Sequence, residues 1–119
     1  MKAALQSFVG IVPDKTEKWD IALHGTAVDD RGLEAIEIAR SVSQSTFNLS
    51  YDADALLLGI HVKPAQPDSL AELYRTRNVT TVYIEATTLG FAEMLLAVRA
   101  GRDAGVERIR FSYAEPGEY

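Results

Sequence analysis

Three polar loops are expected to follow strands, and each carries side chains able to bind a ligand. They span residues 24–32, 85–90 and 113–116. Ligands of open α/β sheets bind beyond the carboxyl ends of the strands, near a change in strand order. If the three strands are parallel neighbours, the loops converge on one rim of the sheet, and we predict a small-molecule site there. The residues that we expect to bind the ligand are His24, Gly25, Thr26, Asp30, Arg31, Thr87, Thr88 and Gly90.

The turn at 87–90 leads directly into an expected helix. Free backbone N–H groups at a helix N-terminus, beside the hydroxyls of Thr87 and Thr88, can hold a phosphate or a carboxylate. The turn matches neither the dinucleotide pattern G-x-G-x-x-G nor the P-loop, and it contains no lysine. In the structural alternative, one of the two threonines only caps its own helix. The negative charge of Glu85 also disfavours a bound anion.

Glu85 and Glu93 are the candidates for catalysis. Glu85 ends an expected strand, and Glu93 lies in the first turn of the helix that follows. A carboxyl group in an apolar cleft can act as a base or accept a hydrogen bond from a ribose hydroxyl. In the structural alternative, Glu85 forms an ion pair with His24 or Arg31. In its own structural alternative, Glu93 complements the helix dipole or accepts a hydrogen bond from the Gly90 N–H.

The segment 24–31 also has two interpretations. His24 ends a strand, Gly25 allows close approach of the backbone, and Thr26 offers a hydroxyl, which suits a binding site. A lone histidine at a strand end can equally be a hydrogen-bonded structural residue. The charged run 29–31 is likewise explained by capping of the next helix and a local ion pair.

The composition leaves few metal or nucleophile sites to consider. The chain has no cysteine, and His24 and His61 are far apart in the sequence, so we predict no zinc site. Carboxylates near the rim could hold Mg²⁺, but no ligand spacing supports such a site. The nucleophile pattern G-x-S-x-G is absent. We therefore expect neither a metal nor another cofactor.

Hydrophobic periodicity predicts the elements that position these residues. Residues 19–24 and 46–51 alternate between apolar and polar side chains, as half-buried strands do. Residues 91–103 are apolar on so much of their helical surface that we expect burial on more than one side. Ser69 and Glu72 have the spacing of a capping box. Strands are expected over 8–12, 19–24, 46–51, 55–62, 80–86 and 108–113, and helices over about 30–43, 69–77 and 91–103.

Two connections decide the expected topology. A tight turn predicts an antiparallel hairpin over about 46–62, and strand-helix-strand order predicts a parallel β-α-β unit over about 80–113. The alternation in 108–113 indicates an edge strand, or a face that another segment covers. We predict an α/β fold, a three-layer Rossmann-like sandwich with a mixed sheet of five to six strands.

The chain has 119 residues, 47% of them apolar, and a net charge of −5, which suits one domain over residues 1–119. The acidic balance argues against a nucleic-acid partner. No apolar run is long enough to cross a membrane, and no signal peptide is present, so we expect a cytoplasmic protein. Because the sequence stops directly after a strand, it favours the N-terminal domain of a longer protein over an intact chain.

Three classes of function fit these features. The first is a regulatory or sensor domain that binds a small ligand, with a nucleotide as one candidate, at the rim. The second is a protein–protein interaction or oligomerisation domain that uses its acidic surface and its edge strand, with a second copy or a further domain packed on the C-terminal strand. The third is an enzyme that cleaves a nucleotide N-glycosidic bond with Glu85 or Glu93. Residues 88–93 are similar to short segments of nucleoside- and NAD-cleaving Rossmann-like enzymes, although the order of groups differs.

Overall fold

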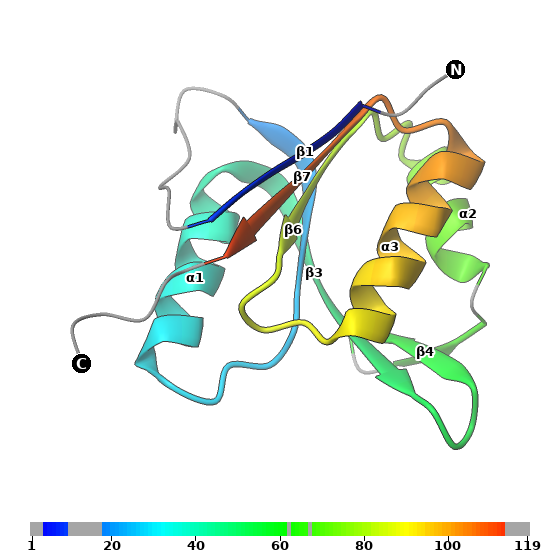
Figure 1. The fold of residues 1–119 in the computed structure, drawn as a ribbon. Helices are drawn as coiled ribbons and strands as arrows, with labels where there is room; N and C mark the ends of the chain where they lie inside the picture. The colour runs from blue at the N-terminus through cyan, green and yellow to red at the C-terminus, as the bar shows by residue number, and fades with distance from the viewer. Residues whose placement is uncertain (1–3, 10–17, 62, 67, 114–119) are drawn as a thin grey trace.

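The structure is a computed structural model that describes residues 4–9, 18–61, 63–66 and 68–113. One seven-stranded sheet, in the order β1-β7-β6-β2-β3-β4-β5, forms the middle of three layers. Helix α1 lies on one face of the sheet, and α2 and α3 lie on the other (Figure 1). The strands are β1 (Ala4–Val9), β2 (Trp19–His24), β3 (Ser43–Asp52), β4 (Leu57–Ile60), β5 (Lys63–Ala65), β6 (Thr81–Glu85) and β7 (Arg108–Tyr113), and the helices are α1 (Asp30–Ser41), α2 (Ser69–Thr76) and α3 (Phe91–Ala104).

The pairing of the strands confirms the predicted architecture. The pairs β1-β7, β7-β6, β6-β2 and β2-β3 are parallel, whereas β3-β4 and β4-β5 are antiparallel. The hairpin predicted over about 46–62 is present as β3 and β4. The parallel β-α-β unit predicted over about 80–113 is present as β6, α3 and β7. The fold is therefore α/β with a mixed sheet between two helical layers.

Two strands are placed differently from the prediction, and a third was not predicted. β5 adds a seventh strand at the sheet edge, where Pro64 is tolerated because β5 pairs only with β4. Of the two alternatives predicted for the C-terminal strand β7, the edge position is wrong, because β1 pairs with it in parallel on the side away from β6. β1 itself spans 4–9 rather than 8–12, and residues 10–12 lie outside the described part of the chain.

The helix ends follow the local sequence, with one exception. Asp29 caps α1, because its Oδ1 accepts a hydrogen bond from the Gly32 N–H at 2.8 Å. Gly105 ends α3 in the left-handed conformation, with φ at 77°. The capping box predicted from Ser69 is not formed. Asp68 takes the N-cap position, Ser69 is already helical, and the described residues provide no side-chain capping bond.

Asp20 fixes the amino ends of the two central strands. Its Oδ2 accepts hydrogen bonds from the Thr80 N–H at 2.8 Å, the Thr80 hydroxyl at 3.0 Å and the Thr81 N–H at 3.2 Å. In return, the Asp20 N–H donates to the Thr81 hydroxyl at 2.9 Å. These bonds hold β2 against β6, so their carboxyl ends lie in a fixed relation at the far edge of the sheet.

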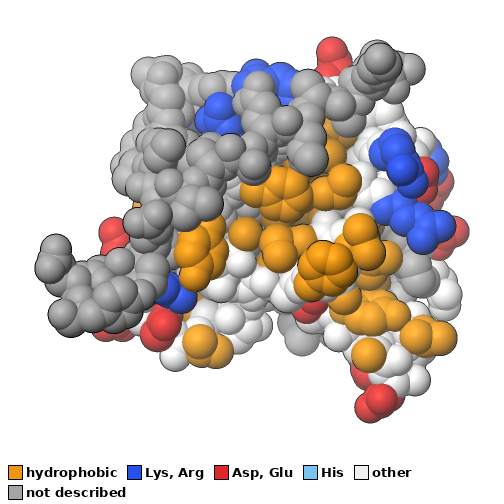
Figure 2. All heavy atoms as spheres, in the orientation of Figure 1, with side chains coloured by type: hydrophobic (Ala, Val, Ile, Leu, Met, Phe, Trp, Pro, Cys, Tyr) orange, Lys and Arg blue, Asp and Glu red, His pale blue; other side chains and the backbone are white. Residues whose placement is uncertain are grey.

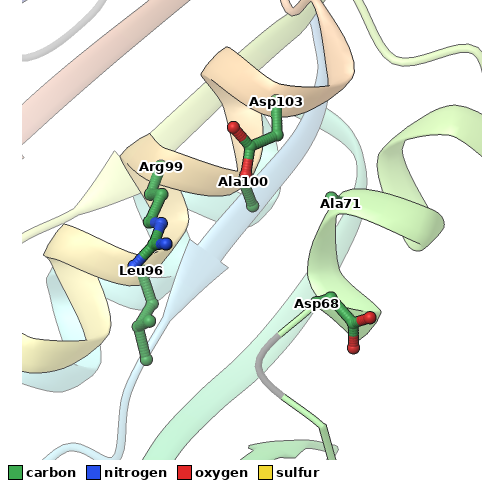
Figure 3. A pocket seen from close by; sticks show the side chains of 6 residues that line it. All are labelled: Asp68, Ala71, Leu96, Arg99, Ala100 and Asp103. Atoms are coloured by element: carbon green, nitrogen blue, oxygen red, sulfur yellow. The ribbon is translucent and has the colours of Figure 1, made fainter.

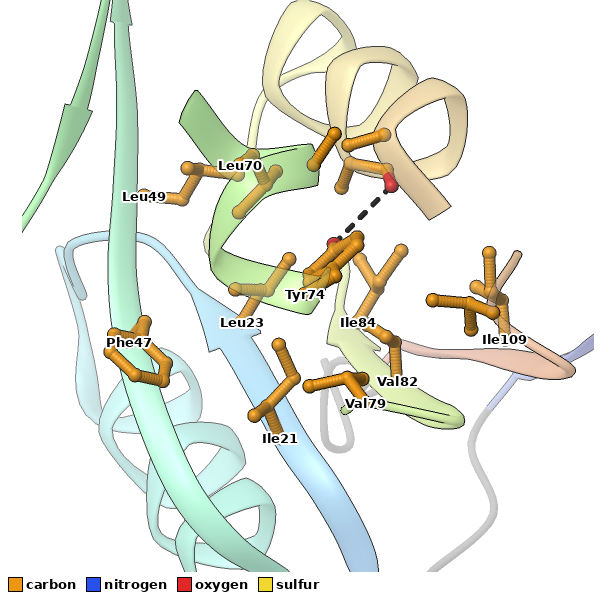
Figure 4. Close-up of a cluster of buried hydrophobic side chains, with 14 of the residues drawn as sticks. Ile21, Leu23, Phe47, Leu49, Leu70, Tyr74, Val79, Val82, Ile84 and Ile109 are labelled. Atoms are coloured by element: carbon orange, nitrogen blue, oxygen red, sulfur yellow. Dashed lines mark hydrogen bonds between the residues drawn. The ribbon is translucent and has the colours of Figure 1, made fainter. Parts of the chain in front are cut away.

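The larger hydrophobic core fills the space between the sheet and the layer of α2 and α3 (Figure 4). Ile21 and Leu23 of β2 lie beside Ile84 of β6, below Tyr74 of α2. Tyr74 is 1% exposed, and its hydroxyl donates a hydrogen bond to the Ala97 carbonyl oxygen at 3.3 Å. This bond satisfies the one polar atom that Tyr74 brings into the core.

Burial raises the pKa of Tyr74 well above its ordinary value near 10. The unfolded chain therefore loses this proton at a lower pH than the folded chain does. We expect the free energy of unfolding to fall above about pH 10, by up to about 1.4 kcal/mol per pH unit for this one group. Urea denaturation at several pH values measures the slope, which Tyr74→Phe lowers. The half-buried Tyr51 provides the control variant, Tyr51→Phe, and equal slopes in the two variants would contradict the prediction.

Candidate functional site

The strand order brings the ends of three predicted site strands to one edge of the sheet. β7, β6 and β2 are parallel neighbours, and Glu85 is paired in register with Ser112 of β7. The loops at 24–32 and 85–90 therefore leave the same rim. For the third loop, Tyr113 lies at this rim, while 114–116 fall outside the described residues.

A chain of hydrogen bonds joins the first two loops. The Gly25 N–H donates to the Thr88 hydroxyl at 2.8 Å, and that hydroxyl donates to Oε2 of Glu85 at 2.7 Å. Oε2 also accepts from the Thr88 N–H at 3.0 Å, and Oε1 accepts from the Thr87 N–H at 2.8 Å. We call Gly25, Thr88 and Glu85 the rim lock, because they connect the end of β2 to the end of β6.

The rim lock defines the role of Glu85. Its side chain is 1% exposed, and both carboxyl oxygens are held by the turn that directly follows it. The ion pair with His24 or Arg31 is not formed, because the N–H groups of its own turn reach Glu85 first. His24 is also buried, and its Nδ1 lies 2.8 Å from the carbonyl oxygen of Gly25. Nδ1 donates a hydrogen bond to this oxygen in the tautomer that carries the proton on Nδ1.

Gly25 is required by the close approach of the two loops. A Cβ at this position would overlap the Thr88 carbonyl oxygen and lie 2.7 Å from the carbonyl carbon. The sequence predicted that another group approaches the backbone closely at Gly25. In the structure that group is the backbone of Thr88, in a neighbouring turn of the same chain.

In front of the rim lock the two loops enclose a cavity of about 210 Å³. Its described lining residues are Thr26, Val28, Asp29, Arg31, Gly32, Thr87, Thr88, Leu89 and Gly90. Five of the predicted ligand-binding residues are among them, whereas His24, Gly25 and Asp30 are not. Asp29 and Gly32 lie there because the first turn of α1 forms one wall, which their capping spacing in the sequence could have indicated.

Arg31 is the cation of this cavity. Its Nε is buried and has no hydrogen-bond partner among the described residues, and its guanidinium carbon lies 5.6 Å from the ring centroid of Tyr113. On the opposite wall, α3 begins at Gly90, and no side chain of the described residues caps that helix. A guanidinium and an uncapped helix start both favour the oxygen atoms of a polar ligand.

Glu93 lies beside this cavity without lining it. Its Oε1 would be 2.8 Å from a Cβ built on Gly90, which places the carboxyl group against the start of α3. That position fits the dipole role of an acidic residue in the first helical turn.

A second cavity, of about 160 Å³, lies between α2 and α3 (Figure 3). Asp68 of α2's N-terminal end and Arg99 and Asp103 of α3 border it, with the small side chains Ala71 and Ala100. None of the predicted site residues lies there. It is smaller than the rim cavity, and its charged residues lie on the solvent side of the helices, since Asp68, Arg99 and Asp103 are exposed.

The described residues hold no group of three or more His, Cys, Asp or Glu side chains placed to bind a metal ion. None of the three described helices has the length and apolar content that crossing a bilayer requires. Comparisons with protein-family models, curated proteins and solved structures found no match to this chain.

Proposed function

We propose that this chain is a binding domain that takes a small polar ligand, with a nucleotide as the candidate class, in the rim cavity. One observation carries the proposal: loops about 60 residues apart are locked together and line one cavity, and Arg31, one of its lining residues, has an Nε with no hydrogen-bond partner among the described residues. The rim lies at the carboxyl ends of parallel strands, where α/β folds bind their ligands.

The size of the cavity limits what it can hold. About 210 Å³ is less than the roughly 300 Å³ at which pockets for drug-sized ligands begin. We therefore expect one end of the ligand, such as a phosphate or a ribose, to occupy the cavity, with the remainder on the open surface. Arg31 would donate to its oxygens, and the exposed Thr26 would offer a hydroxyl.

Asp29 and Asp30 add negative charge near this ligand. Asp29 accepts the Gly32 N–H at one carboxyl oxygen as the cap of α1, so part of its hydrogen-bonding capacity is used while its negative charge remains. Asp30 is exposed and does not line the cavity. Arg31 is the positively charged side chain among the described lining residues, and its guanidinium group can donate hydrogen bonds to a ligand.

A thermal-shift series tests the proposal with AMP, GMP, ADP and NAD⁺ as probes. A ligand that binds only the folded chain raises the Tm, by about 5 °C or more when it is well above its Kd. We expect at least one probe to do so. Arg31→Ala should abolish the shift, measured against the variant's own unliganded Tm.

Arg40→Ala provides the matched control, because Arg40 lies in the last turn of the same helix and, among the described residues, forms an ion pair with Glu37 at the surface. The control should keep the full shift. If no probe raises the Tm at millimolar concentration, or if both variants keep the shift, the rim cavity is not the ligand site.

The enzymatic alternative has weaker support. Glu85 is enclosed in the rim lock, and Glu93 does not line the cavity, so neither carboxyl group faces the space that a ligand would fill. An interaction through the C-terminal strand is not supported either, because β7 is paired on both sides.

A further inference from the structure

We infer that a second copy of this chain packs against the outward face of α3, independently of the ligand site. The inner face of α3 is buried through Ala97, Ala100 and Gly101. On the opposite side, Phe91 is 77% exposed and Leu95 is 56% exposed. A helix that is apolar on both sides normally has a second partner, and exposed apolar patches mark interaction sites.

The outward face of α3 carries one stripe, in which Val98 is half-buried and also packs against the core. Phe91, Leu95, Val98 and Arg102 are spaced by four, three and four residues, which is the spacing of neighbours along one face of a helix. Figure 2 shows hydrophobic side chains gathered along α3 and over the adjoining strands of this face. We call these four residues the α3 stripe.

The α3 stripe is complementary to itself when two copies run antiparallel. Its spacing reads the same in both directions, so a two-fold axis between Leu95 and Val98 places Leu95 opposite the second copy's Val98. The same axis places Phe91 opposite the second copy's Arg102. The pairs are then apolar against apolar in the centre and a cation against an aromatic ring at each end.

A hollow beside the stripe supports this packing. It has a volume of about 310 Å³, and the described residues that line it include Leu95, Val98, Arg99 and Arg102. These four positions are the i, i+3, i+4 and i+7 set that forms the hole of a knobs-into-holes contact. In the antiparallel arrangement, Leu95 of the second copy is the side chain that enters it.

Charge favours the antiparallel direction over the parallel one. In a parallel pair, Arg102 would face the second copy's Arg102, whereas the antiparallel pair separates the two cations along the axis. The chain as a whole carries −5, so two copies repel each other at long range. An interface whose charged members are arginines lowers that repulsion where the copies meet.

Sedimentation velocity of the full chain over about 5 to 500 µM tests the inference, since the mass-action equilibrium then shifts measurably. We expect a monomer–dimer equilibrium, with the dimer Kd raised at least about tenfold by Leu95→Arg, because the added cation then enters a hollow that Arg99 and Arg102 line. Leu33→Arg is the matched control, because Leu33 of α1 is also exposed, at 57%. It should leave the equilibrium unchanged, and far-UV circular dichroism verifies that both variants fold.

Cysteine crosslinking tests the direction, and the chain has no cysteine to interfere. A mixture of the Leu95→Cys and Val98→Cys variants should form disulfide-linked dimers faster than either variant forms them by itself. A wild-type chain that stays monomeric throughout the concentration range would overturn the inference. So would a dimer that tolerates Leu95→Arg, or crosslinking that is fastest within Leu95→Cys alone.

Discussion

Gly25→Ala is expected to lower the free energy of unfolding by about 3 kcal/mol, and it should disrupt the rim cavity. The new Cβ would overlap the Thr88 carbonyl group, which belongs to the backbone and cannot rotate away. The loops must then separate, and the hydrogen bond from the Gly25 N–H to the Thr88 hydroxyl is lost with them. Urea denaturation measures the stability change.

Gly90→Ala is the control for this prediction. At Gly90 the new Cβ would meet only the carboxyl end of Glu93, a flexible side chain that can move. We expect a loss below about 1 kcal/mol there, mainly from alanine being a poorer N-cap than glycine. Equal losses in the two variants would show that the loops do not approach each other as described.

Glu85→Ala is expected to cost about 2–4 kcal/mol, although Glu85 lies at the edge of the sheet rather than in the hydrophobic core. The substitution removes the acceptor of three hydrogen bonds, two from backbone N–H groups and one from the Thr88 hydroxyl. Glu85→Gln should cost less, because it keeps one oxygen, but its amide would face a donor. Chemical denaturation of both variants gives the ranking.

Glu93→Ala is the comparison for Glu85→Ala, because Glu85 accepts three hydrogen bonds whereas Glu93 is expected to interact with the helix dipole. Glu93 is half-buried and adjoins Gly90, so its removal should cost less than about 1 kcal/mol, in line with a dipole interaction. If Glu85→Ala were as mild as Glu93→Ala, the rim lock would not hold the turn. Glu85 would then again be a candidate for direct interaction with a ligand.

Much of the fold could be predicted from periodicity. The alternation in 19–24 and 108–113 reproduces the bounds of β2 and β7, and the expected helix at 91–103 falls one residue short of α3. The alternation or periodicity of apolar side chains is visible in these segments, because one face of each is buried. The parallel pairing of β6 and β7 followed from the length of the helix between them.

The predictions were wrong where the position of a strand depends on its pairing partner in the sheet. Nothing local indicates that β1 pairs with β7, since the two segments are about 100 residues apart and the partner is chosen by the whole sheet. β5 contains Pro64, which is tolerated only because the strand ends the sheet. The capping box at Ser69 failed because the helix begins one residue too early for its hydroxyl to cap it.

The convergence of two loops at one rim could be predicted from the sequence, whereas the hydrogen bonds of Glu85 could not. The strand ends placed the loops at 24–32 and 85–90 on one rim, and the structure brings both around one cavity. The role of Glu85 depended on which donors lie within hydrogen-bonding distance of its oxygens. That is a property of the turn conformation at 86–89, which no spacing in the sequence encodes.

The rim lock and the cavity have different expected roles in ligand binding. Gly25, Thr88 and Glu85 join the two loops by hydrogen bonds, and Arg31 and Gly90, which precedes α3, are among the described residues that line the cavity. For the proposed ligand, loops that are already joined lower the entropy cost of binding, because the ligand does not have to order them.

The most direct measurement of the ligand site is a titration of the ¹⁵N-labelled chain with AMP, with inorganic phosphate in parallel, followed by two-dimensional NMR. We predict that the amide signals of Thr26, Gly32 and Thr88 shift as ligand is added, while those of the hairpin turn at 53–56 stay unchanged. Shifts confined to residues away from the rim, or no shift at millimolar AMP or phosphate, would contradict the account.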